Sequence, residues 1–331
     1  MRIVALEEHL ILPELAARIG RDAILARGLN VGGKVPPVVD RRAQLVEVGT
    51  GRLADMDAAG ISVQVLSLAG PGADLLPGAE GAALARDMND ALARLVAEHP
   101  SRYAAFAHLP MSAPEAAADE LERCVTRHGF VGGMVNGTTA GLFLDDPSFT
   151  PLLARFEALD VPLYLHPAPP PKAVREAYYD HLPGDAGLLL SIAGWGWHSE
   201  TAIHVLRLAL SGALDRHPRL KLVIGHMGEG LPAMFARCDQ VFADEARDRL
   251  TRTVSGTITD QVWVTTSGFF SLPPLLPLLM TFGADRVMFS IDYPFSPNRR
   301  GRDFLDALPI SPHDKVKLAH ANADKLLKLK T

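Results

Sequence analysis

The sequence predicts a single α/β domain, a distorted (β/α)8 TIM barrel that spans residues 1–331. Eight short apolar runs rich in β-branched residues recur along the chain, and segments with helical spacing lie between most of them. This alternation is typical of a parallel sheet, because each connection between parallel strands is long enough to hold a helix. No charge block, Ser/Gly linker or internal repeat divides the chain, and one barrel can accommodate this length without a second core.

The apolar runs give the order of the predicted strands. From the N-terminus they are Ile3–Leu6, Val63–Leu68, Ala104–His108, Val131–Val135, Pro162–Leu165, Leu220–Ile224, Val262–Thr266 and Arg286–Ile291. Pro and Gly lie at most of the junctions between these runs and the segments that follow them, as expected for loops. Eight strands of this kind favour a barrel over an open sheet.

Three of the connecting segments have clear helical character. Ala82–Glu98 and Pro114–Arg127 are rich in helix-forming residues, and Glu200–Leu214 places its aliphatic side chains on one helical face. Two other segments, Leu10–Asp40 and Pro167–Gly196, are long excursions that follow the first and fifth predicted strands. Long segments at strand ends usually build a functional site, so we expect both to border one.

Composition restricts the class of function. With 33 basic and 38 acidic side chains, a formal net charge of -5 and 48% hydrophobic residues, the chain is expected to have a large core and no nucleic-acid-binding surface. Cys124 and Cys238 are too few for a disulfide framework or a thiolate metal site. The N-terminus has no signal-peptide pattern, and the apolar segment Phe269–Ala284 contains three prolines and is too short to span a membrane. We expect a cytoplasmic protein that binds a small molecule.

A polar residue ends most of the predicted strands. These residues are Glu7 and His9 on the first strand, Asn136 on the fourth, His166 on the fifth, His226 on the sixth and Asp292 on the eighth. The carboxyl ends of the strands of a (β/α)8 barrel meet at one face, and catalytic residues lie there. We therefore expect three imidazoles and two carboxylates to converge on one mouth.

Four of these side chains form a predicted site for one divalent metal ion. Glu7 and His9 are two residues apart on a strand, so both point to the same face and Glu8 points away. With His166 and Asp292 they offer two nitrogen and two carboxylate ligands. This mixed set suits Zn2+ or Mn2+ and leaves positions open for substrate or water, as in catalytic rather than structural metal sites.

Five stretches of the sequence resemble one known family. They are ALEEH at 5–9, GFVGGMVNG at 129–137, VPLYLHP at 161–167, HPRLKLVIGHMGEGLP at 217–232 and FSIDYPF at 289–295. They are similar to patterns of the amidohydrolase superfamily, in its branch of metal-dependent, non-oxidative aromatic-acid decarboxylases, which includes the gamma-resorcylate, 2,3-dihydroxybenzoate and 5-carboxyvanillate enzymes. The resemblance extends over nearly the whole chain.

The resemblance implies roles for individual residues. The implied metal ligands are Glu7, His9, His166 and Asp292, with His226 and Glu229 as an acid/base pair beside the ion. Many hydrolytic relatives open with H-x-H and carry a metal-bridging lysine after the fourth strand, where this chain has Glu7 and Asn136. We therefore expect one ion rather than two. The resemblance also implies a homo-oligomer.

The expected activity is decarboxylation of a hydroxylated aromatic, or similar cyclic, carboxylic acid. The ring carbon must accept a proton before CO2 leaves, and we expect Asp292 to supply it, with His226 and Glu229 as a relay. The metal ion would chelate the substrate carboxylate and an ortho hydroxyl group. Further substrate contacts are expected from Asn136, Arg52, Arg237 and Phe295. An arginine offers a planar fork to a carboxylate, although Arg237 has a structural ion pair with Asp239 as its alternative.

Two other functions stay open at this point. One is a metal-dependent hydrolase of a lactone or amide, with Asp292 as a base toward water, and the other is a non-catalytic binding protein with the same fold. Several relatives place an aromatic side chain from the loop after the first strand over the substrate, but Leu10–Asp40 has no Phe, Tyr or Trp. The substrate is therefore not specified. His108 is assigned to a structural role, and His198 and His204 to packing or surface positions.

Overall fold

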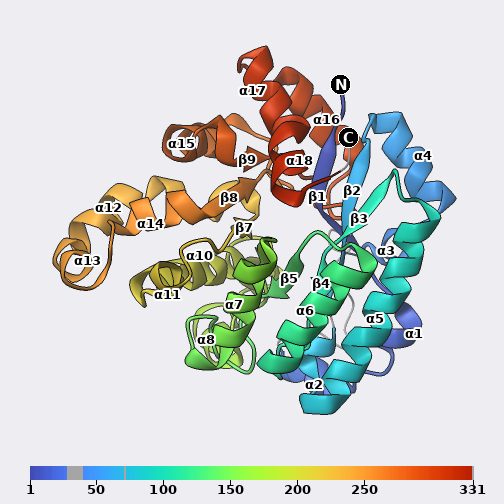
Figure 1. Cartoon of the computed structure of the whole chain (residues 1–331), viewed down its shortest axis with the longest axis horizontal. Helices are drawn as coiled ribbons and strands as arrows, with labels where there is room; N and C mark the ends of the chain where they lie inside the picture. Colours follow the sequence, from blue (N-terminus) through green and yellow to red (C-terminus); the bar gives the residue numbers. More distant parts are fainter. Residues whose placement is uncertain (28–39, 71, 330–331) are drawn as a thin grey trace.

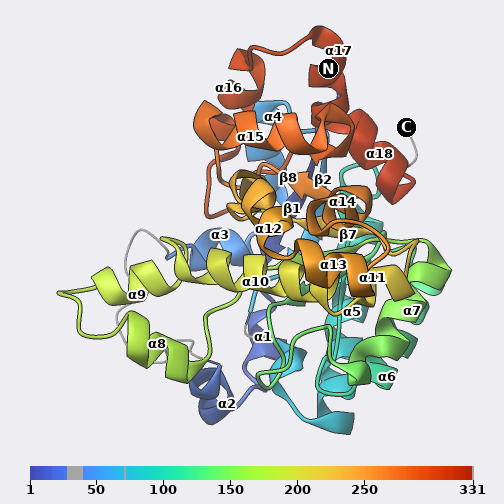
Figure 2. The same ribbon diagram turned by 90° about the vertical axis from the view of Figure 1, so that its left-hand side faces the viewer.

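The computed structural model confirms the α/β architecture with parallel strands. It describes residues 1–27, 40–70 and 72–329. Figure 1 shows the strands at the centre of the molecule and the long helices around them. The first residues of the chain and the last helix lie at the same end (Figure 2), where Arg2 forms an ion pair of 3.1 Å with Asp324.

Each of the eight predicted apolar runs overlaps a strand. The strands are β1 (Val4–Leu10), β2 (Val63–Leu68), β3 (Tyr103–Ala105), β4 (Ala107–His108), β5 (Gly133–Asn136), β6 (Leu163–His166), β7 (Leu222–Ile224), β8 (Val262–Thr265) and β9 (Val287–Met288). Neighbouring strands are parallel throughout, in the orders β1-β2-β3 and β4-β5-β6-β7-β8-β9. The third predicted strand is therefore divided into two short ones.

The two sheets are parts of one ring. β3 and β4 are separated only by Phe106, whose N–H donates to the carbonyl of Leu66 in β2 (3.0 Å). At the other seam, Tyr293 after β9 forms a parallel bridge with Glu8, and the N–H of His9 donates to the carbonyl of Tyr293 (2.7 Å). The last strand thus returns to the first, as expected for a (β/α)8 barrel.

The helices of the described residues cover the outside of the strands. They are α1 (Pro13–Ala16), α2 (Arg21–Ala26), α3 (Arg42–Val46), α4 (Thr50–Ala59), α5 (Gly78–Glu98), α6 (Pro114–His128), α7 (Thr150–Leu159), α8 (Lys172–Tyr178), α9 (Ala186–Ser191), α10 (Gly196–Leu210), α11 (Ala213–Arg216), α12 (Phe235–Val241), α13 (Ala243–Arg249), α14 (Val254–Gln261), α15 (Leu272–Phe282), α16 (Asn298–Ala307), α17 (Pro312–Val316) and α18 (Asn322–Leu327). The predicted helix Glu200–Leu214 is divided into α10 and α11, because Gly212 adopts a left-handed backbone conformation with φ 73°.

The core has an inner and an outer layer. The inner layer collects buried side chains from nearly every strand, and α18 packs against the same cluster: Val4, Leu6, Val65, Phe106, Met134, Tyr164, Val223, Met288, Leu326 and Leu327. The outer layer lies between the strands and the surrounding helices. Because apolar residues of α18 join the inner cluster, the C-terminal helix covers the amino end of the barrel and leaves the carboxyl end for a site.

A β-bulge in β1 decides which of its side chains reach that site. Ala5 pairs with Gln64 and Glu8 pairs with Leu66, so three steps along β1 match two steps along β2. Strict alternation would place Glu8 on the same face as Leu6 of the inner layer. The extra residue reverses the alternation, and Glu7, rather than Glu8, points into the barrel mouth.

The two predicted excursions contain short helices. Leu10–Asp40 includes α1 and α2, and its residues 28–39 lie outside the described residues. Pro167–Gly196 includes α8 and α9, which extend to one side of the molecule in Figure 2. Within residues 1–27, 40–70 and 72–329, every helix is too short or too polar to span a membrane.

Candidate metal centre and substrate cavity

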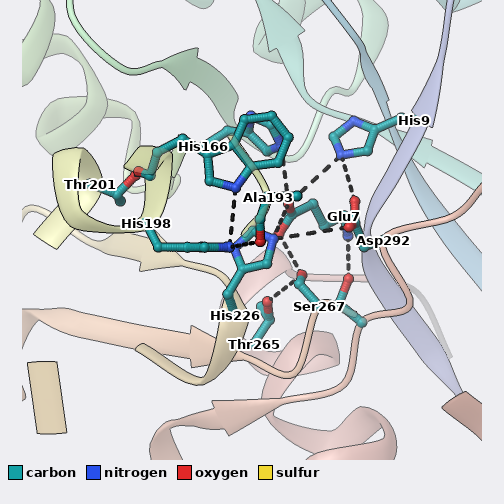
Figure 3. A network of polar contacts seen from close by, with 12 residues as sticks. Glu7, His9, His166, Ala193, His198, Thr201, His226, Thr265, Ser267 and Asp292 are labelled. Carbon is teal, nitrogen blue, oxygen red and sulfur yellow. Dashed lines mark hydrogen bonds and ion pairs between the residues drawn. The ribbon is translucent and has the colours of Figure 1, made fainter. Parts of the chain in front are cut away.

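Five side chains from four positions around the barrel converge at its carboxyl end (Figure 3). They are Glu7 and His9 on β1, His166 at the end of β6, His226 after β7 and Asp292 after β9. The structure therefore brings together the residues that the strand ends predict, including the four proposed metal ligands.

The donor atoms of these residues face one another at the spacing of ligands around a single ion. Glu7 Oε1 lies 3.1 Å from His166 Nε2 and 3.7 Å from both His9 Nε2 and His226 Nε2. Asp292 Oδ1 lies 3.3 Å from His9 Nε2. Two atoms bonded to one ion at about 2.1 Å are separated by similar distances. Glu7 Oε1 and His9 Nε2 are buried without a hydrogen-bond partner, so the arrangement fits a divalent cation that would satisfy both.

Outer contacts hold the two ligands of β1 in place. Glu7 Oε2 accepts hydrogen bonds from the hydroxyls of Tyr164 and Ser267, which leaves Oε1 free to face the cluster. His9 Nδ1 lies 3.0 Å from the hydroxyl of Ser67, which leaves Nε2 free in the same way. Such partners orient metal ligands and tune their affinity. Sequence reasoning did not identify these hydroxyls, because they lie in the interiors or at the ends of apolar strands without a motif of their own.

The pKa shifts in the cluster show that its carboxylates favour a cation beside them. Burial alone would raise the pKa of Glu7, but the charge of His226 and the neighbouring imidazoles of His166 and His9 hold that pKa well below its ordinary value. Burial alone would lower the pKa of His9, but the carboxylates of Asp292 and Glu7 raise it to about 9. Closely spaced, buried carboxylates stabilise any cation placed between them, whether a proton on an imidazole or a metal ion.

Glu229 bridges two histidines beside the cluster. Its Oε1 accepts from His226 Nδ1 at 2.8 Å, which confirms that these two residues lie together as predicted. Its Oε2 lies 2.5 Å from His198 Nδ1, and the rings of His198 and His226 are 4.6 Å apart. His198 is therefore buried beside the candidate site and lines the cavity, rather than lying on the surface. The residue lies at the start of α10, and a sequence offers no direct signal that this helix end reaches the loop after β7.

The backbone around these residues is strained. His226, Glu229 and Asp292 adopt positive φ angles of 51°, 56° and 65°. Residues other than glycine rarely adopt this backbone conformation. Each such conformation costs about 1–3 kcal/mol and persists where the surrounding structure holds it. The strain supports a functional rather than a purely structural reason for these turns.

A cavity of about 440 Å3 opens next to the cluster. Its lining includes the predicted residues Asn136 and Phe295, together with Trp197 and Phe269. The ring of Phe295 lies 5.9 Å from that of His9. An apolar space with a few polar groups at one wall is typical of a small-molecule site, and aromatic walls suit a flat ring.

Two predicted substrate contacts are not supported by the structure. Arg52 is fully buried outside the cavity lining, and it donates to Gln64 (2.7 Å) and to the carbonyl of His9 (2.8 Å), so it braces β1 instead of facing the substrate. Arg237 lies on the exposed surface of α12, where it donates to Gln240 (3.0 Å). We therefore do not assign either arginine to the substrate within this chain. The suggested ion pair of Arg237 is wrong as well, since Asp239 accepts from Ser255.

Two other buried histidines, His108 and His204, have structural contacts. His108 Nε2 accepts the N–H of Ala73 (2.8 Å), and His204 Nε2 accepts the N–H of Leu144 (2.7 Å). Both imidazoles are buried, and burial lowers their pKa. These contacts agree with the structural roles expected for His108 and His204.

Comparison with known proteins places this arrangement in a family. Residues 46–329 match the profile of the family described as Amidohydrolase. The gamma-resorcylate decarboxylase of Rhodococcus jostii (strain RHA1) is 40% identical over 342 residues, which cover 98% of this chain and 98% of that protein. A crystal structure of 2,6-dihydroxybenzoate decarboxylase complexed with 2,6-dihydroxybenzoate matches with a TM-score of 0.87 and 37% identity, covering 99% of this chain and 100% of its own.

A second solved structure adds a bound metal. It is the dihydroxybenzoic acid decarboxylase from Polaromonas sp. JS666 with manganese and the inhibitor 2-nitroresorcinol, with a TM-score of 0.86 and 34% identity over 99% of this chain and 97% of its own. These matches confirm the resemblance that the five sequence stretches indicate. The chain belongs to the amidohydrolase family, and its similar relatives include the aromatic-acid decarboxylases of that family.

Proposed function

We propose that this protein is a metal-dependent, non-oxidative decarboxylase of a hydroxylated aromatic carboxylic acid, and thus a carbon-carbon lyase. The observation that carries the proposal is the position of Asp292, which lies beside His9 and His226 and also lines the cavity. A carboxyl group at that place faces both the ligand cluster and the space for a ring. The relatives at 40% and 37% identity are named as decarboxylases, which supports the same chemistry here.

One divalent ion, manganese or zinc, fits the site. Glu7, His9, His166 and Asp292 would hold it, and manganese is bound in the Polaromonas relative. When bound, the ion supplies positive charge that orients the substrate carboxylate and an ortho hydroxyl group and stabilises the negative charge on their oxygens.

Asp292 would protonate the ring carbon that carries the carboxylate. The new carbon-hydrogen bond interrupts the aromatic system, the bond to the carboxylate then breaks, CO2 leaves, and the electron pair of that bond restores the ring. His226 Nε2 lies 4.0 Å from Asp292 Oδ2, and Glu229 bridges His226 to His198. This chain of buried groups supports a relay that returns a proton to Asp292.

The cavity walls would hold the ring and exclude water. Trp197, Phe269 and Phe295 offer apolar faces next to the ligand cluster. A ring between such faces is kept in a fixed orientation toward Asp292, and a dry surrounding strengthens the electrostatic interactions of the carboxylate. Asn136 adds a polar side chain at the end of β5, next to His166 in the sheet.

The test is CO2 release from a panel of hydroxybenzoates, measured with metal-free protein reconstituted in parallel with Mn2+ and Zn2+. We expect release that depends on the metal and that falls by at least about 100-fold in Asp292→Asn, since general acid catalysis contributes about that much or more. An Asp292→Asn protein that keeps its metal and its turnover would overturn the role of Asp292. Opening of a lactone or amide without CO2 release would instead identify a hydrolase.

Two further predictions accompany this function. A homo-oligomer is expected from the family resemblance, and light scattering of the purified protein would measure its mass. A cytoplasmic location is also proposed, and fractionation of cells that express the chain would test it.

A further inference from the structure

A carboxylate lies in the cavity wall away from the ligand cluster. Asp74 belongs to the short helical turn η1 (Ala73–Leu75), which follows β2, and it lines the cavity. Its side chain is only 13% exposed, and its Oδ1 atom is buried without a hydrogen-bond partner. Asp74 is no part of the proposed chemistry, so its position needs a separate explanation.

The nearest imidazole does not satisfy this carboxylate. His108 Nε2 lies 3.7 Å from Asp74 Oδ1, beyond hydrogen-bond range. The same nitrogen accepts the N–H of Ala73 at 2.8 Å, so it presents a lone pair and has no proton to donate. A carboxylate with an unpaired oxygen costs free energy. Oδ1 itself is covered, so a ligand in the cavity would donate to the exposed part of the Asp74 side chain and recover part of that cost.

Arg27 contributes a positive charge to the same cavity. It follows α2 and donates to the carbonyls of Pro169 (3.0 Å) and Asn136 (3.1 Å), which fixes its guanidinium over the ends of β5 and β6. Burial lowers the pKa of Arg27, while Coulombic attraction to Asp74 raises it. The guanidinium thus disfavours a cationic donor such as an ammonium group near Asp74 and favours a neutral donor.

The remaining lining restricts the donor further. Leu75, Ile192 and Trp197 present apolar surface to the same cavity as the ligand cluster and Asp74, which suits a flat apolar ring. The neutral donor that an aromatic ring commonly carries at its edge is a hydroxyl group.

We propose that Asp74 accepts a hydrogen bond from a hydroxyl group of the substrate ring other than the one beside the carboxylate. This subsite makes the enzyme selective for aromatic acids with at least two hydroxyl groups. The inference rests on the proposed function for the identity of the ring acid, and it adds the residue that recognises the second hydroxyl.

The first experiment compares substrates on the manganese-loaded full chain. The kcat/KM for 2-hydroxybenzoate is measured beside those for the 2,3-, 2,4-, 2,5- and 2,6-dihydroxybenzoates. We expect the wild type to prefer one or more dihydroxybenzoates by at least about tenfold, the usual effect of one hydrogen bond to a charged group. Asp74→Ala is expected to lower kcat/KM for the preferred acid by about 10- to 100-fold without lowering it for 2-hydroxybenzoate.

Two variants separate recognition from damage to the cavity. Asp74→Asn has the same shape and keeps an acceptor oxygen, so it should retain part of the preference. Leu75→Ala enlarges the neighbouring apolar wall and should lower kcat/KM for all the acids by a similar factor. Loss of activity on every acid by the same factor in Asp74→Ala, or an unchanged preference in that variant, would overturn the subsite.

A binding measurement separates this inference from the proposed function. Calorimetric titration of the manganese-loaded wild type and Asp74→Ala with phenol, catechol and resorcinol requires no decarboxylation. If no acid releases CO2 but a dihydroxybenzene binds at least tenfold more tightly than phenol only when Asp74 is present, the proposed function is wrong and the subsite is supported. Equal binding of phenol and both dihydroxybenzenes by the wild type would overturn the subsite.

Discussion

The two faces of β1 carry neighbouring glutamates whose carboxyl groups are both fully buried and chemically opposite. Glu7 faces three imidazoles, and its pKa lies well below the ordinary value although burial alone would raise it. Glu8 faces the seam between β1 and the segment after β9, and burial raises its pKa to about 8. The surroundings, rather than the depth of burial, determine whether a carboxyl group keeps its charge. A charged one attracts a cation, whereas the other joins two segments of the fold.

Replacement of Glu7 should have the largest effect. Glu7→Gln keeps the shape of the side chain but removes the negative charge beside the imidazoles and replaces one carboxylate oxygen with an amide nitrogen. We expect metal affinity to fall by more than about 100-fold, the upper end of the effect of losing an outer contact to a ligand. Metal content after dialysis and CO2 release would measure the loss.

The unfolding curve of metal-free Glu7→Gln provides the control. The Glu7 carboxylate stabilises the imidazoles around it, so the variant should lose some free energy of unfolding but remain folded, and a loss of metal is then not caused by unfolding. A variant that binds Mn2+ as tightly as the wild type would remove Glu7 from the ligand set.

Replacement of Glu8 should affect mainly stability, whereas replacement of Glu7 affects mainly metal binding. Its oxygens accept from the N–H groups of Ile291 (2.9 Å) and Tyr293 (3.3 Å) and from Gln64 Nε2 (3.2 Å). Above pH 8, where the Glu8 carboxyl is ionised and accepts from all these donors, the new amide N–H2 of Glu8→Gln faces one of them, so we expect the free energy of unfolding to fall by about 1–3 kcal/mol. Urea denaturation of the metal-free protein measures the change.

Metal content distinguishes the two faces in this variant. Glu8→Gln should still bind Mn2+ when folded, because its side chain does not reach the ligand cluster. A loss of metal equal to that of Glu7→Gln, with unchanged stability, would contradict the division of roles along β1.

Removal of a hydroxyl that supports Glu7 should have a smaller effect. Tyr164→Phe removes one donor to Glu7 Oε2 and leaves that of Ser267 in place. We expect metal affinity to fall by about tenfold with the fold retained, since outer contacts typically contribute 10- to 100-fold. Competition with a chelator measures this affinity. Ser267→Ala is the matched variant, and unchanged affinity in both would show that Glu7 needs no such support.

The smallest expected effect is a dependence of the free energy of unfolding on pH, caused by the buried His204. Burial lowers the pKa of His204 from its ordinary 6.5 to about 3. The unfolded chain therefore binds a proton more readily, so the stability that His204 contributes is present above pH 6.5 and is lost as the pH falls toward 3. The slope is at most about 1.4 kcal/mol per pH unit.

His204→Gln isolates this contribution. The amide oxygen can still accept the N–H of Leu144 but does not titrate, so the variant should lose less stability than the wild type between pH 6 and pH 4. Urea denaturation at several pH values measures the difference. Parallel curves for the two proteins would show that His204 does not titrate on unfolding.

The sequence predicted more of the fold than of the side-chain contacts. All eight strands were found, because buried parallel strands leave continuous apolar runs. The break between β3 and β4 was not, since the run from Ala104 to His108 stays apolar through Phe106. The polar residues at strand ends were also found, because a carboxyl end of a barrel strand is a place where buried polar side chains gather.

The residues that were missed or misplaced depend on contacts between distant segments. His198 reaches Glu229 across 31 positions of sequence, and Asp74 shares a cavity with Arg27 through two separate loops. Arg52 was expected at the substrate, yet it lies under β1 because α4 packs its charged end inward against Gln64. Neither the spacing of residues nor the composition of the chain predicts contacts between segments that are distant in sequence.

The sequence alone therefore determined the class of fold, the set of ligand types and the mouth at which they meet, because periodicity and strand-end chemistry are local properties. The spacing of Glu7 and His9 had already placed them on one face of the strand, opposite Glu8. The tertiary structure decided how this face comes to point into the barrel mouth, because one extra residue in β1 opposite β2 reverses the alternation of side chains after Leu6. It also decided the outer partners of the site, since these come from strands and helices that only folding brings together.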